Sequence, residues 1–265
     1  RPMRAFWVTI LVGFFTLWPC AYGTVNARNG VTINTSSTIN GKTPNSAVNG
    51  QTVAAASGPL VAFAAASATN PNTVTTAEIN TTAANLIVIA VSAASTAGDS
   101  IYPSDSQSNT WTGLTWRESG VGGGNSVRIF YCYAPTTNSS HTFSFPHSSS
   151  YATILVMAFS GMASSPFDVE AGNNFTSAVT SFPSGSVTPS QANTIVITAL
   201  AVGDLSTAPS IDSGFTVQCV GPGVGGSSWA GAAGYKVLTA ASAQNPTWTT
   251  AASSIGATST AVFKY

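Results

Sequence analysis

From residue 60 to the end of the chain, short runs of aliphatic, β-branched and aromatic residues alternate with clusters of Gly, Ser, Asn and Pro. Residues 127–133 show a period of two, while residues 87–91 and 153–159 are nearly continuous apolar runs. A period of two is typical of β-strands, and short apolar runs between turn residues are typical of strands that are buried on both faces. We find no helical periodicity beyond residue 23, so the pattern predicts an all-β domain over residues 59–265.

The strand pattern occurs twice, in repeats spanning about residues 74–161 and 182–265. Residues 84–89 (ANLIVI) return as residues 192–197 (ANTIVI), and Phe159 near the end of the first repeat returns as Phe263. Self-similarity of this kind indicates two equivalent structural units. The expected strands are 60–68, 73–80, 85–93, 109–118, 126–134, 141–145, 152–160, 167–172, 177–183, 194–202, 215–220, 229–238, 246–250 and 258–264.

Two architectures suit such a repeat. One is a two-sheet β-sandwich of jelly-roll type built from two similar halves, which would interleave as two Greek keys. The alternative is two immunoglobulin-like sandwiches in tandem. The connection over residues 161–181 is not a Pro/Gly linker, and its Phe167 and Val169 are expected to be buried. This connection favours the single sandwich.

One set of motifs resembles a known family. Residues 82–91 are followed by Asp105-Ser106 and by residues 109–112, 129–131 and 158–161, and together these resemble a β-sandwich module found in secreted bacterial proteins and some phage-associated proteins. The resemblance covers roughly residues 60–265. It implies a secreted binding or structural module, and it transfers no catalytic residue.

The N-terminus has the pattern of a secretory signal peptide over residues 1–23. Arg4 precedes an apolar stretch at residues 5–18, and small residues follow at 21–23, where cleavage would occur. The apolar stretch is shorter than a segment that spans a bilayer. We therefore expect a secreted or cell-surface protein with no membrane segment in its mature form.

Residues 24–58 contain Asn-Gly three times, at 29–30, 40–41 and 49–50. Asn-Gly favours tight hairpin turns, because both residues tolerate positive φ. The segment could form small hairpins, a strand added to the main sheet, or an extended arm. It has too few large apolar residues for a core of its own, so we interpret it as a β-prone arm or linker. Such an arm could also pair with an edge strand of another copy of the protein.

Charge limits the range of partners. Only 6% of the residues are charged, and Lys plus Arg and Asp plus Glu balance at 8 each. No basic surface for nucleic acid is therefore expected. A weakly charged surface rich in Ser, Thr, Asn and Gly is common among extracellular β proteins and among subunits that pack against copies of themselves.

No motif reaches the strength of a catalytic or metal-binding signature. His141 and His147 are interpreted as residues at surface strand ends, and Asp105 as an acceptor of backbone N–H groups in an Asx turn. Asp168 and Glu170 are interpreted as a solvated strand edge. Residues 221–226 match G-x-G-x-x-G but precede an expected strand instead of a helix. We expect no catalytic residue, no metal and no cofactor, and the chain is more typical of a non-enzyme.

Aromatic residues and cysteines supply the remaining candidates. Sugar-binding sandwiches use exposed aromatic faces, so Trp116, Trp229 and Trp248 are candidate glycan-binding residues, with burial between the sheets as the alternative. Removal of the signal peptide leaves Cys132 and Cys219, which could form a disulfide in an oxidising compartment or remain two buried thiols.

These observations favour a secreted, non-enzymatic surface protein with an adhesive or structural role, able to self-assemble. A carbohydrate-binding module is the alternative. A second alternative is a hydrolase with a dispersed site, which would need a cleft that holds His141 or His147 beside a hydroxyl group and a carboxylate.

Overall fold

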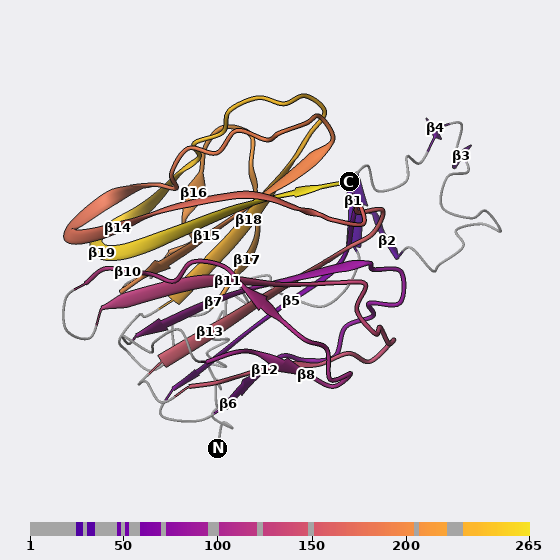
Figure 1. Ribbon diagram of the computed structural model, residues 1–265, viewed down its shortest axis with the longest axis horizontal. Helices are drawn as coiled ribbons and strands as arrows, with labels where there is room; N and C mark the ends of the chain where they lie inside the picture. The colour runs from indigo at the N-terminus through magenta and orange to yellow at the C-terminus, as the bar shows by residue number, and fades with distance from the viewer. Residues whose placement is uncertain are drawn as a thin grey trace, which may run out of the picture.

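The computed structural model describes residues 59–69, 73–94, 101–120, 124–147, 151–203, 207–221 and 230–265, together with four short strands nearer the N-terminus. The described residues form strands and turns and no helix (Figure 1). The all-β prediction is therefore confirmed. Nothing in the described part of the chain could cross a bilayer as a helix.

Each half of the repeat forms one antiparallel sheet of six strands. The first has the order β10-β11-β7-β13-β5, with β9 also paired to β11. The second has the order β17-β18-β15-β19-β14, with β16 also paired to β19. The five strands that follow one another across each sheet occupy corresponding places, and only the added strands β9 and β16 differ in position, so the two-sheet sandwich of two similar halves is confirmed. The strands of the first sheet are β5 (Leu60–Thr69), β7 (Leu86–Ala94), β9 (Thr112–Gly113), β10 (Arg117–Glu118), β11 (Asn125–Tyr133) and β13 (Tyr151–Phe159), and those of the second are β14 (Phe167–Pro183), β15 (Thr194–Val202), β16 (Ser210–Ile211), β17 (Thr216–Val220), β18 (Ala230–Leu238) and β19 (Thr247–Lys264).

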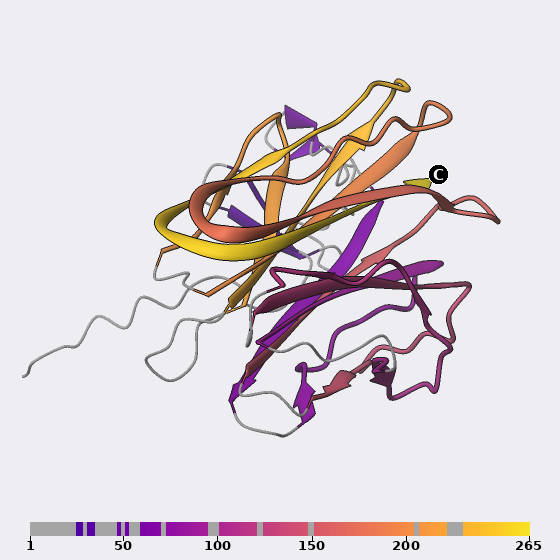
Figure 2. The same cartoon turned by 60° about the vertical axis from the view of Figure 1, so that its left-hand side comes forward.

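The two sheets stack face to face around a central core, with the second sheet above the first (Figures 1 and 2). The first sheet contributes mostly large side chains to this core, and the second contributes mostly small ones, which lets the sheets approach closely. A Cβ atom at Gly231 of β18 would lie only 2.7 Å from the Cβ of Ser92 on β7. The core includes Leu86, Val88, Ile129, Leu155, Met157 and Phe159 from the first sheet and Ala199, Ala201, Ala233, Ala257 and Ala261 from the second.

The halves do not exchange strands between the sheets as two interleaved Greek keys would. Every strand of the first sheet precedes every strand of the second, and the chain passes from one sheet to the other through the segment between β13 and β14. Phe167 at the start of β14 is partly buried and stacks on Tyr131 of the first sheet, with ring centroids 5.8 Å apart. Val169 is also partly buried. This connection therefore belongs to the sandwich, as its composition predicted.

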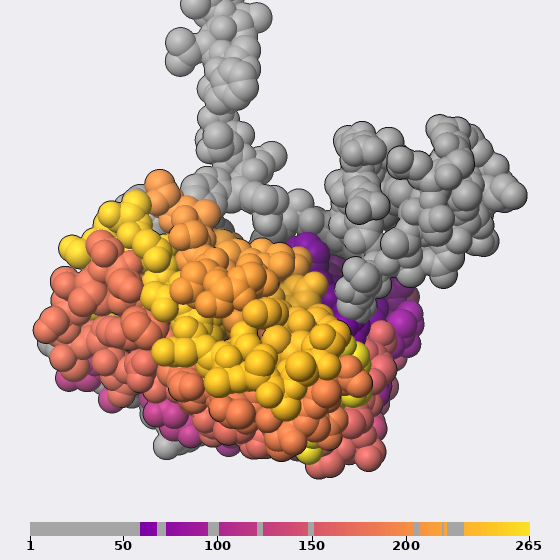
Figure 3. Space-filling view, turned by 90° about the horizontal axis from the view of Figure 1, so that it is seen from above, coloured from indigo at the N-terminus to yellow at the C-terminus, as the bar shows by residue number. Residues whose placement is uncertain are grey.

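The outer face of each sheet has a cover from its own half. In the first half the cover is a separate three-stranded sheet of β6 (Thr73–Thr75), β12 (Phe143–Pro146) and β8 (Ser104–Asp105), in the order β6-β12-β8. In the second half the long strands β14 and β19 continue from the main sheet into the cover, where β19 also pairs with β16. Figure 3 looks onto the second half, which forms most of that surface and leaves the first half visible only along the rim.

In β7 and β15, the residues that face the central core are offset by one position from the residues that the sequence match aligns. Leu86, Val88 and Ala90 face the central core, as do Ile195 and Ile197. The matched segments 84–89 and 192–197 would pair Ile87 with Ile195, and these two side chains point to opposite faces. In these two strands, structurally equivalent positions share the same buried face and do not always hold the residues that are identical in the sequence match.

The N-terminal segment contains two small hairpins. β1 (Val25–Arg28) pairs with β2 (Val31–Asn34), and β3 (Ala47–Val48) pairs with β4 (Gln51–Thr52). The small hairpins that the sequence allowed in this segment are therefore present. None of the four strands joins the larger sheets. The predicted signal peptide, residues 1–23, and all three Asn-Gly pairs lie outside the described residues.

Candidate functional site

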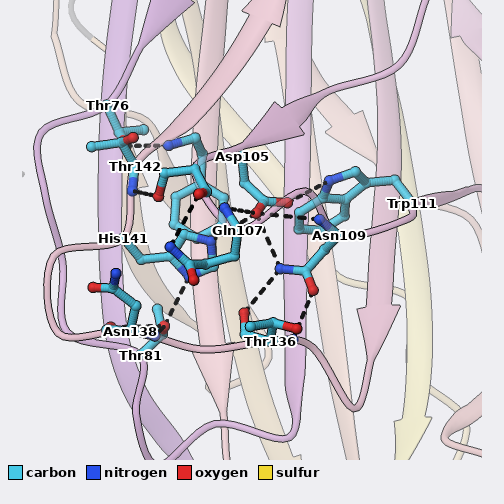
Figure 4. Close-up of polar contacts among 12 residues, drawn as sticks. Thr76, Thr81, Asp105, Gln107, Asn109, Trp111, Thr136, Asn138, His141 and Thr142 are labelled. Atoms are coloured by element: carbon cyan, nitrogen blue, oxygen red, sulfur yellow. Dashed lines mark hydrogen bonds and ion pairs between the residues drawn. The ribbon is translucent and has the colours of Figure 1, made fainter.

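The strongest polar constellation of the described chain surrounds His141, just before β12 (Figure 4). The His141 Nε2 atom lies 3.0 Å from Asp105 Oδ1, and the Nδ1 atom lies 2.9 Å from Thr81 Oγ1. An ionised carboxylate only accepts hydrogen bonds, so Nε2–H donates to Asp105. Thr81 Oγ1 is the hydrogen-bond partner of Nδ1 on the other side of the ring. We call Thr81, Asp105 and His141 the histidine cluster.

Two strands and a turn position the histidine cluster. His141 and Ile79 form an isolated antiparallel bridge, with backbone hydrogen bonds of 2.9 and 3.0 Å, and Thr81 follows this bridge. Asp105 ends β8, which pairs with β12. The chain turns directly after Asp105, and Ser108 in this turn has a positive φ of 58°. The cluster therefore joins three separate segments of the outer cover.

Asp105 accepts hydrogen bonds from several further donors. Its Oδ1 atom lies 2.8 Å from the backbone N of Gln107 and 3.1 Å from Asn109 Nδ2, and its Oδ2 atom lies 3.0 Å from Trp111 Nε1. The bond from Gln107 is the Asx turn that the sequence predicted. Burial acts to raise the pKa of Asp105, but the hydrogen bonds from His141, Gln107 and Asn109 outweigh burial and lower the pKa below its ordinary value of 3.8.

The histidine cluster is closed to solvent. Thr81 and the side chains of His141 and Asp105 have zero exposure. The His141 ring stacks on Phe143 with centroids 4.2 Å apart, and Trp111 packs edge-on against Phe143 from another side. The predicted place of His141 at a surface strand end is therefore wrong. His147, which is 6% exposed, is also buried.

The order hydroxyl group, imidazole and carboxylate is the order that nucleophilic hydrolases use. Such chemistry needs a substrate carbonyl beside the hydroxyl oxygen. Thr81 Oγ1 is enclosed instead, since it also lies 3.2 Å from the backbone O of Asn138 and 3.3 Å from its backbone N. A shallow depression at the ends of β7, β11 and β13 does not include any residue of the cluster. The geometry supports a structural role, in which the cluster holds segments of the cover together, and leaves no room for a substrate beside Thr81 Oγ1.

The second half has different chemistry at the equivalent place. The bridge between Val187 and Gln244 repeats the bridge between Ile79 and His141, so glutamine stands where the first half has histidine. Gln244 Oε1 lies 3.1 Å from Lys236 Nζ, which also donates to the backbone O of Ser213 at 2.7 Å. The cluster of His141 is therefore not a feature of the repeat itself.

The three tryptophans do not form one sugar-binding face. Trp248 has zero exposure, and its Nε1 donates to Thr198 Oγ1 at 3.1 Å, so its assignment as a glycan-binding residue is wrong. It pairs with Phe182 across the outer cover and therefore faces the apolar cluster beneath. Trp116 is half-buried, and its buried Nε1 atom has no hydrogen-bond partner. Trp229 lies outside the described residues.

Cys132 is a free, buried thiol, so the disulfide with Cys219 is not formed. The reason is topological, since Cys132 lies on β11 of the first sheet and points to the outer face, while Cys219 lies on β17 of the second sheet. Burial, together with the negative charge of Asp105, raises the pKa of Cys132 to about 11. The thiol is therefore protonated and unreactive at neutral pH.

Asp168 and Glu170 are half-buried and hydrogen-bonded, which differs from the solvated edge that we expected. Asp168 accepts from the backbone N of Ser190 at 2.7 Å and from its hydroxyl group at 2.6 Å. Glu170 accepts from the backbone N and the hydroxyl group of Thr115, each at 3.0 Å. Since Thr115 belongs to the first half, Glu170 joins the two halves at the sandwich edge.

One signal in the sequence could have located the histidine cluster. His141, Phe143 and Phe145 alternate with a period of two, which places the imidazole on the same buried face as two phenylalanines. In the described part of the chain, no group of three or more His, Cys, Asp and Glu could hold a metal ion. Comparisons with known proteins gave no match to a family model, a curated protein or a solved structure.

Proposed function

We propose that the chain is a secreted, non-enzymatic protein that serves as a structural or adhesive scaffold at the cell surface or outside the cell. The observation that carries this proposal is the closure of the histidine cluster. The one arrangement among the described residues that has the composition of a hydrolytic triad is completely buried, and its hydrogen bonds hold three segments of the cover together. A scaffold uses such groups for rigidity, whereas an enzyme must expose them.

Three further features support a scaffold. The central core fills the space between two large sheets, and Glu170 and Asn174 of β14 tie the second half to the first at Thr115 and Glu118. The low charge suits a protein that packs against other surfaces. The signal-like residues 1–23 support export.

Export is tested by expression of the full chain with a C-terminal tag in a bacterial host. We expect the protein in the medium or at the cell surface, with a new N-terminus near residue 24. Retention of the uncleaved chain in the cytoplasm would contradict the proposal.

The absence of catalysis is tested with ester, amide and glycoside substrates on the folded wild-type protein and on two variants. Thr81→Val keeps the shape of the side chain, and His141→Gln introduces the residue that the second half has at this place. Thr188→Val at an exposed position is the matched control. We expect no saturable turnover in any of the four proteins. Turnover by the wild type and the control that both cluster variants lose would overturn the proposal.

Adhesion is tested on a glycan array and on immobilised extracellular polymers. Saturable glycan binding that Trp116→Ala abolishes would assign the chain to the carbohydrate-binding alternative.

A further inference from the structure

One short motif recurs along the chain without a role in the histidine cluster or the core. Asn-x-Ser/Thr, in which x is any residue except proline, is the acceptor sequence for N-linked glycans in exported proteins. The chain contains it at Asn34, Asn80, Asn138 and Asn174. Asn245 begins a similar triplet, but proline in the middle position excludes it. The structure describes all three residues of the triplets at 80, 138 and 174, so the surroundings of these asparagines can be compared.

The triplet at Asn80 holds the side-chain oxygen and leaves the nitrogen free. Asn80 Oδ1 accepts hydrogen bonds from the backbone N of Thr82 at 3.0 Å and from the Thr82 hydroxyl group at 2.7 Å. Asn80 and Thr82 are exposed, while Thr81 between them is anchored in the histidine cluster. Among the described residues, no acceptor lies within hydrogen-bonding distance of Asn80 Nδ2. This nitrogen therefore faces solvent from a fixed position.

Asn174 on β14 presents its nitrogen in the same way. Its Oδ1 atom accepts from the backbone N of Glu118 at 3.2 Å, and both Asn174 and Thr176 are exposed. Its Nδ2 atom has no hydrogen-bond acceptor in the described part of the chain. A substituent on Nδ2 would extend into solvent and would break no contact of the fold.

Four asparagines without the motif use their nitrogen inside the protein. In each of them Nδ2 donates to a backbone O: Met162 for Asn85 at 2.8 Å, Thr136 for Asn109 at 3.0 Å, Ile255 for Asn125 at 2.8 Å and Pro183 for Asn173 at 2.9 Å. A sugar on any of these nitrogens would disturb an internal contact. Asn173 and Asn174 are neighbours on one strand, and only the asparagine that has the motif leaves its nitrogen free.

We propose that Asn80 and Asn174 are attachment sites for N-linked oligosaccharides. This assignment rests on the proposed function, because only an exported chain meets the donor, an oligosaccharide joined to a lipid through a diphosphate. In the transfer, Nδ2 attacks C1 of the first sugar. The bond from C1 to the diphosphate oxygen breaks, the bond from Nδ2 to C1 forms, Nδ2 gives up one proton, and the lipid diphosphate leaves.

Asn138 is not assigned, although Ser140 completes its triplet. Asn138 is half-buried, and its backbone O and N both contact Thr81 Oγ1, at 3.2 and 3.3 Å. Glycans at Asn80 and Asn174 would place one oligosaccharide on each half of the sandwich. Because only 6% of the residues are charged, these glycans would provide hydration that charged side chains supply in most proteins.

The test is expression of the full chain in a yeast secretory host, which supplies this donor. Secreted protein is analysed by peptide mass spectrometry before and after treatment with peptide-N-glycosidase, which leaves aspartate at each modified asparagine. We expect glycans at Asn80 and Asn174 and none at Asn245, the exposed control whose triplet contains proline.

Variants of the third residue separate recognition of the motif from simple exposure of the asparagine. Thr82→Val keeps Asn80 but removes the hydroxyl group, and it should abolish the glycan at position 80 and leave the glycan at position 174. Thr82→Ser restores a hydroxyl group and should restore the glycan. Thr176→Val and Thr176→Ser should act in the same way on Asn174. Unchanged circular dichroism of the secreted variants would show that the fold is intact.

The possible failures are distinguishable. Secreted protein in which either Asn80 or Asn174 is unmodified overturns the assignment of that residue and leaves export standing. A glycan at position 80 that persists in Thr82→Val overturns the role of the motif there. Chain that stays uncleaved in the cytoplasm contradicts the proposed function, and the assignment falls with it because the donor is never met.

Discussion

Asp105→Asn is the substitution that measures the histidine cluster most sharply. Asparagine has nearly the shape of aspartate but carries no charge and offers one acceptor oxygen in place of two. Asp105 now accepts from His141 and Gln107 through Oδ1 and from Trp111 through Oδ2. The asparagine amide nitrogen would therefore face a donor. In one orientation this donor is the indole N–H of Trp111, and in the other it is the N–H groups of His141 and Gln107. At least one buried donor loses its acceptor.

The expected cost follows from these contacts. An unsatisfied buried donor costs about 1–3 kcal/mol, and a hydrogen bond to a charged group contributes roughly 1.5–3 kcal/mol. We therefore expect Asp105→Asn to lower the free energy of unfolding by about 3 kcal/mol, measured by urea unfolding at pH 7 with tryptophan fluorescence as the signal.

Asp212→Asn is the matched control. Asp212 is exposed and accepts from the backbone N of Thr247 at 2.8 Å and from the hydroxyl group of Ser213 at 2.9 Å. Its substitution should cost less than about 1 kcal/mol, as is usual for exposed polar contacts. Equal losses for the two variants would refute the reasoning, because they would show that burial of the first carboxylate makes no difference.

Acid pH provides a second check on the same variant. Because the pKa of Asp105 in the folded protein lies below its ordinary value of 3.8, the unfolded chain binds this proton more readily than the folded protein does. The stabilisation by the carboxylate is therefore present above pH 3.8 and is lost as the pH falls below that value. The difference between wild type and Asp105→Asn should shrink in this range. A difference that stays constant down to pH 2 would contradict the ionised carboxylate as its cause.

Three further outcomes are expected. Gly231→Val should lower the unfolding free energy by about 1–3 kcal/mol in urea, because its Cβ would press on Ser92, whereas an unchanged midpoint would show that the sheets can separate without cost. Ser259→Ala should leave the free energy of unfolding within about 0.5 kcal/mol of wild type or raise it, because the buried hydroxyl group has no hydrogen-bond partner. Thr198→Val removes the acceptor of Trp248 and should cost about 1–3 kcal/mol. A larger loss for Ser259→Ala than for Thr198→Val would refute these assignments. Cys132 should resist iodoacetamide at pH 8 in the folded protein and react after denaturation, followed by peptide mass spectrometry, and rapid native alkylation would show that the thiol is accessible.

Sequence patterns predicted the buried strands closely. The expected strands at 194–202 and 85–93 match β15 (Thr194–Val202) and β7 (Leu86–Ala94) to within one residue. A strand that is buried on both faces is apolar along its whole length, so the apolar run and the strand end together. Two similar halves also followed from the repeat alone.

Other elements depended on contacts that a linear pattern does not contain. The expected strand at 109–118 divides into β9 and β10, since the chain between them brings the backbone O of Leu114 within 2.6 Å of Arg128 Nε. The expected strands at 167–172 and 177–183 are one strand, β14, because it continues through its register shifts from the main sheet into the cover.

The candidate site was predictable only in part. The turn at Asp105 was predicted from the residue type. The prediction for His141 was wrong, although its alternation with Phe143 is a signal that could have placed it on the buried face. The contact between Asp105 and His141 was not predictable, because 36 residues separate them and β8 must pair with β12 before they meet. The sheet order that brings them together depends on the packing of the whole cover.

Among the described residues, the histidine cluster is sealed from solvent, and the proposed scaffold function depends on this closure. The most direct test is the rate at which diethyl pyrocarbonate modifies His141 in the native protein at pH 7, measured by peptide mass spectrometry against the same chain in urea. A sealed side chain reacts only through opening of the structure, so we predict that the native rate is at least about 100-fold below the unfolded rate. A native rate within about tenfold of the unfolded rate would show an accessible imidazole and would contradict the account.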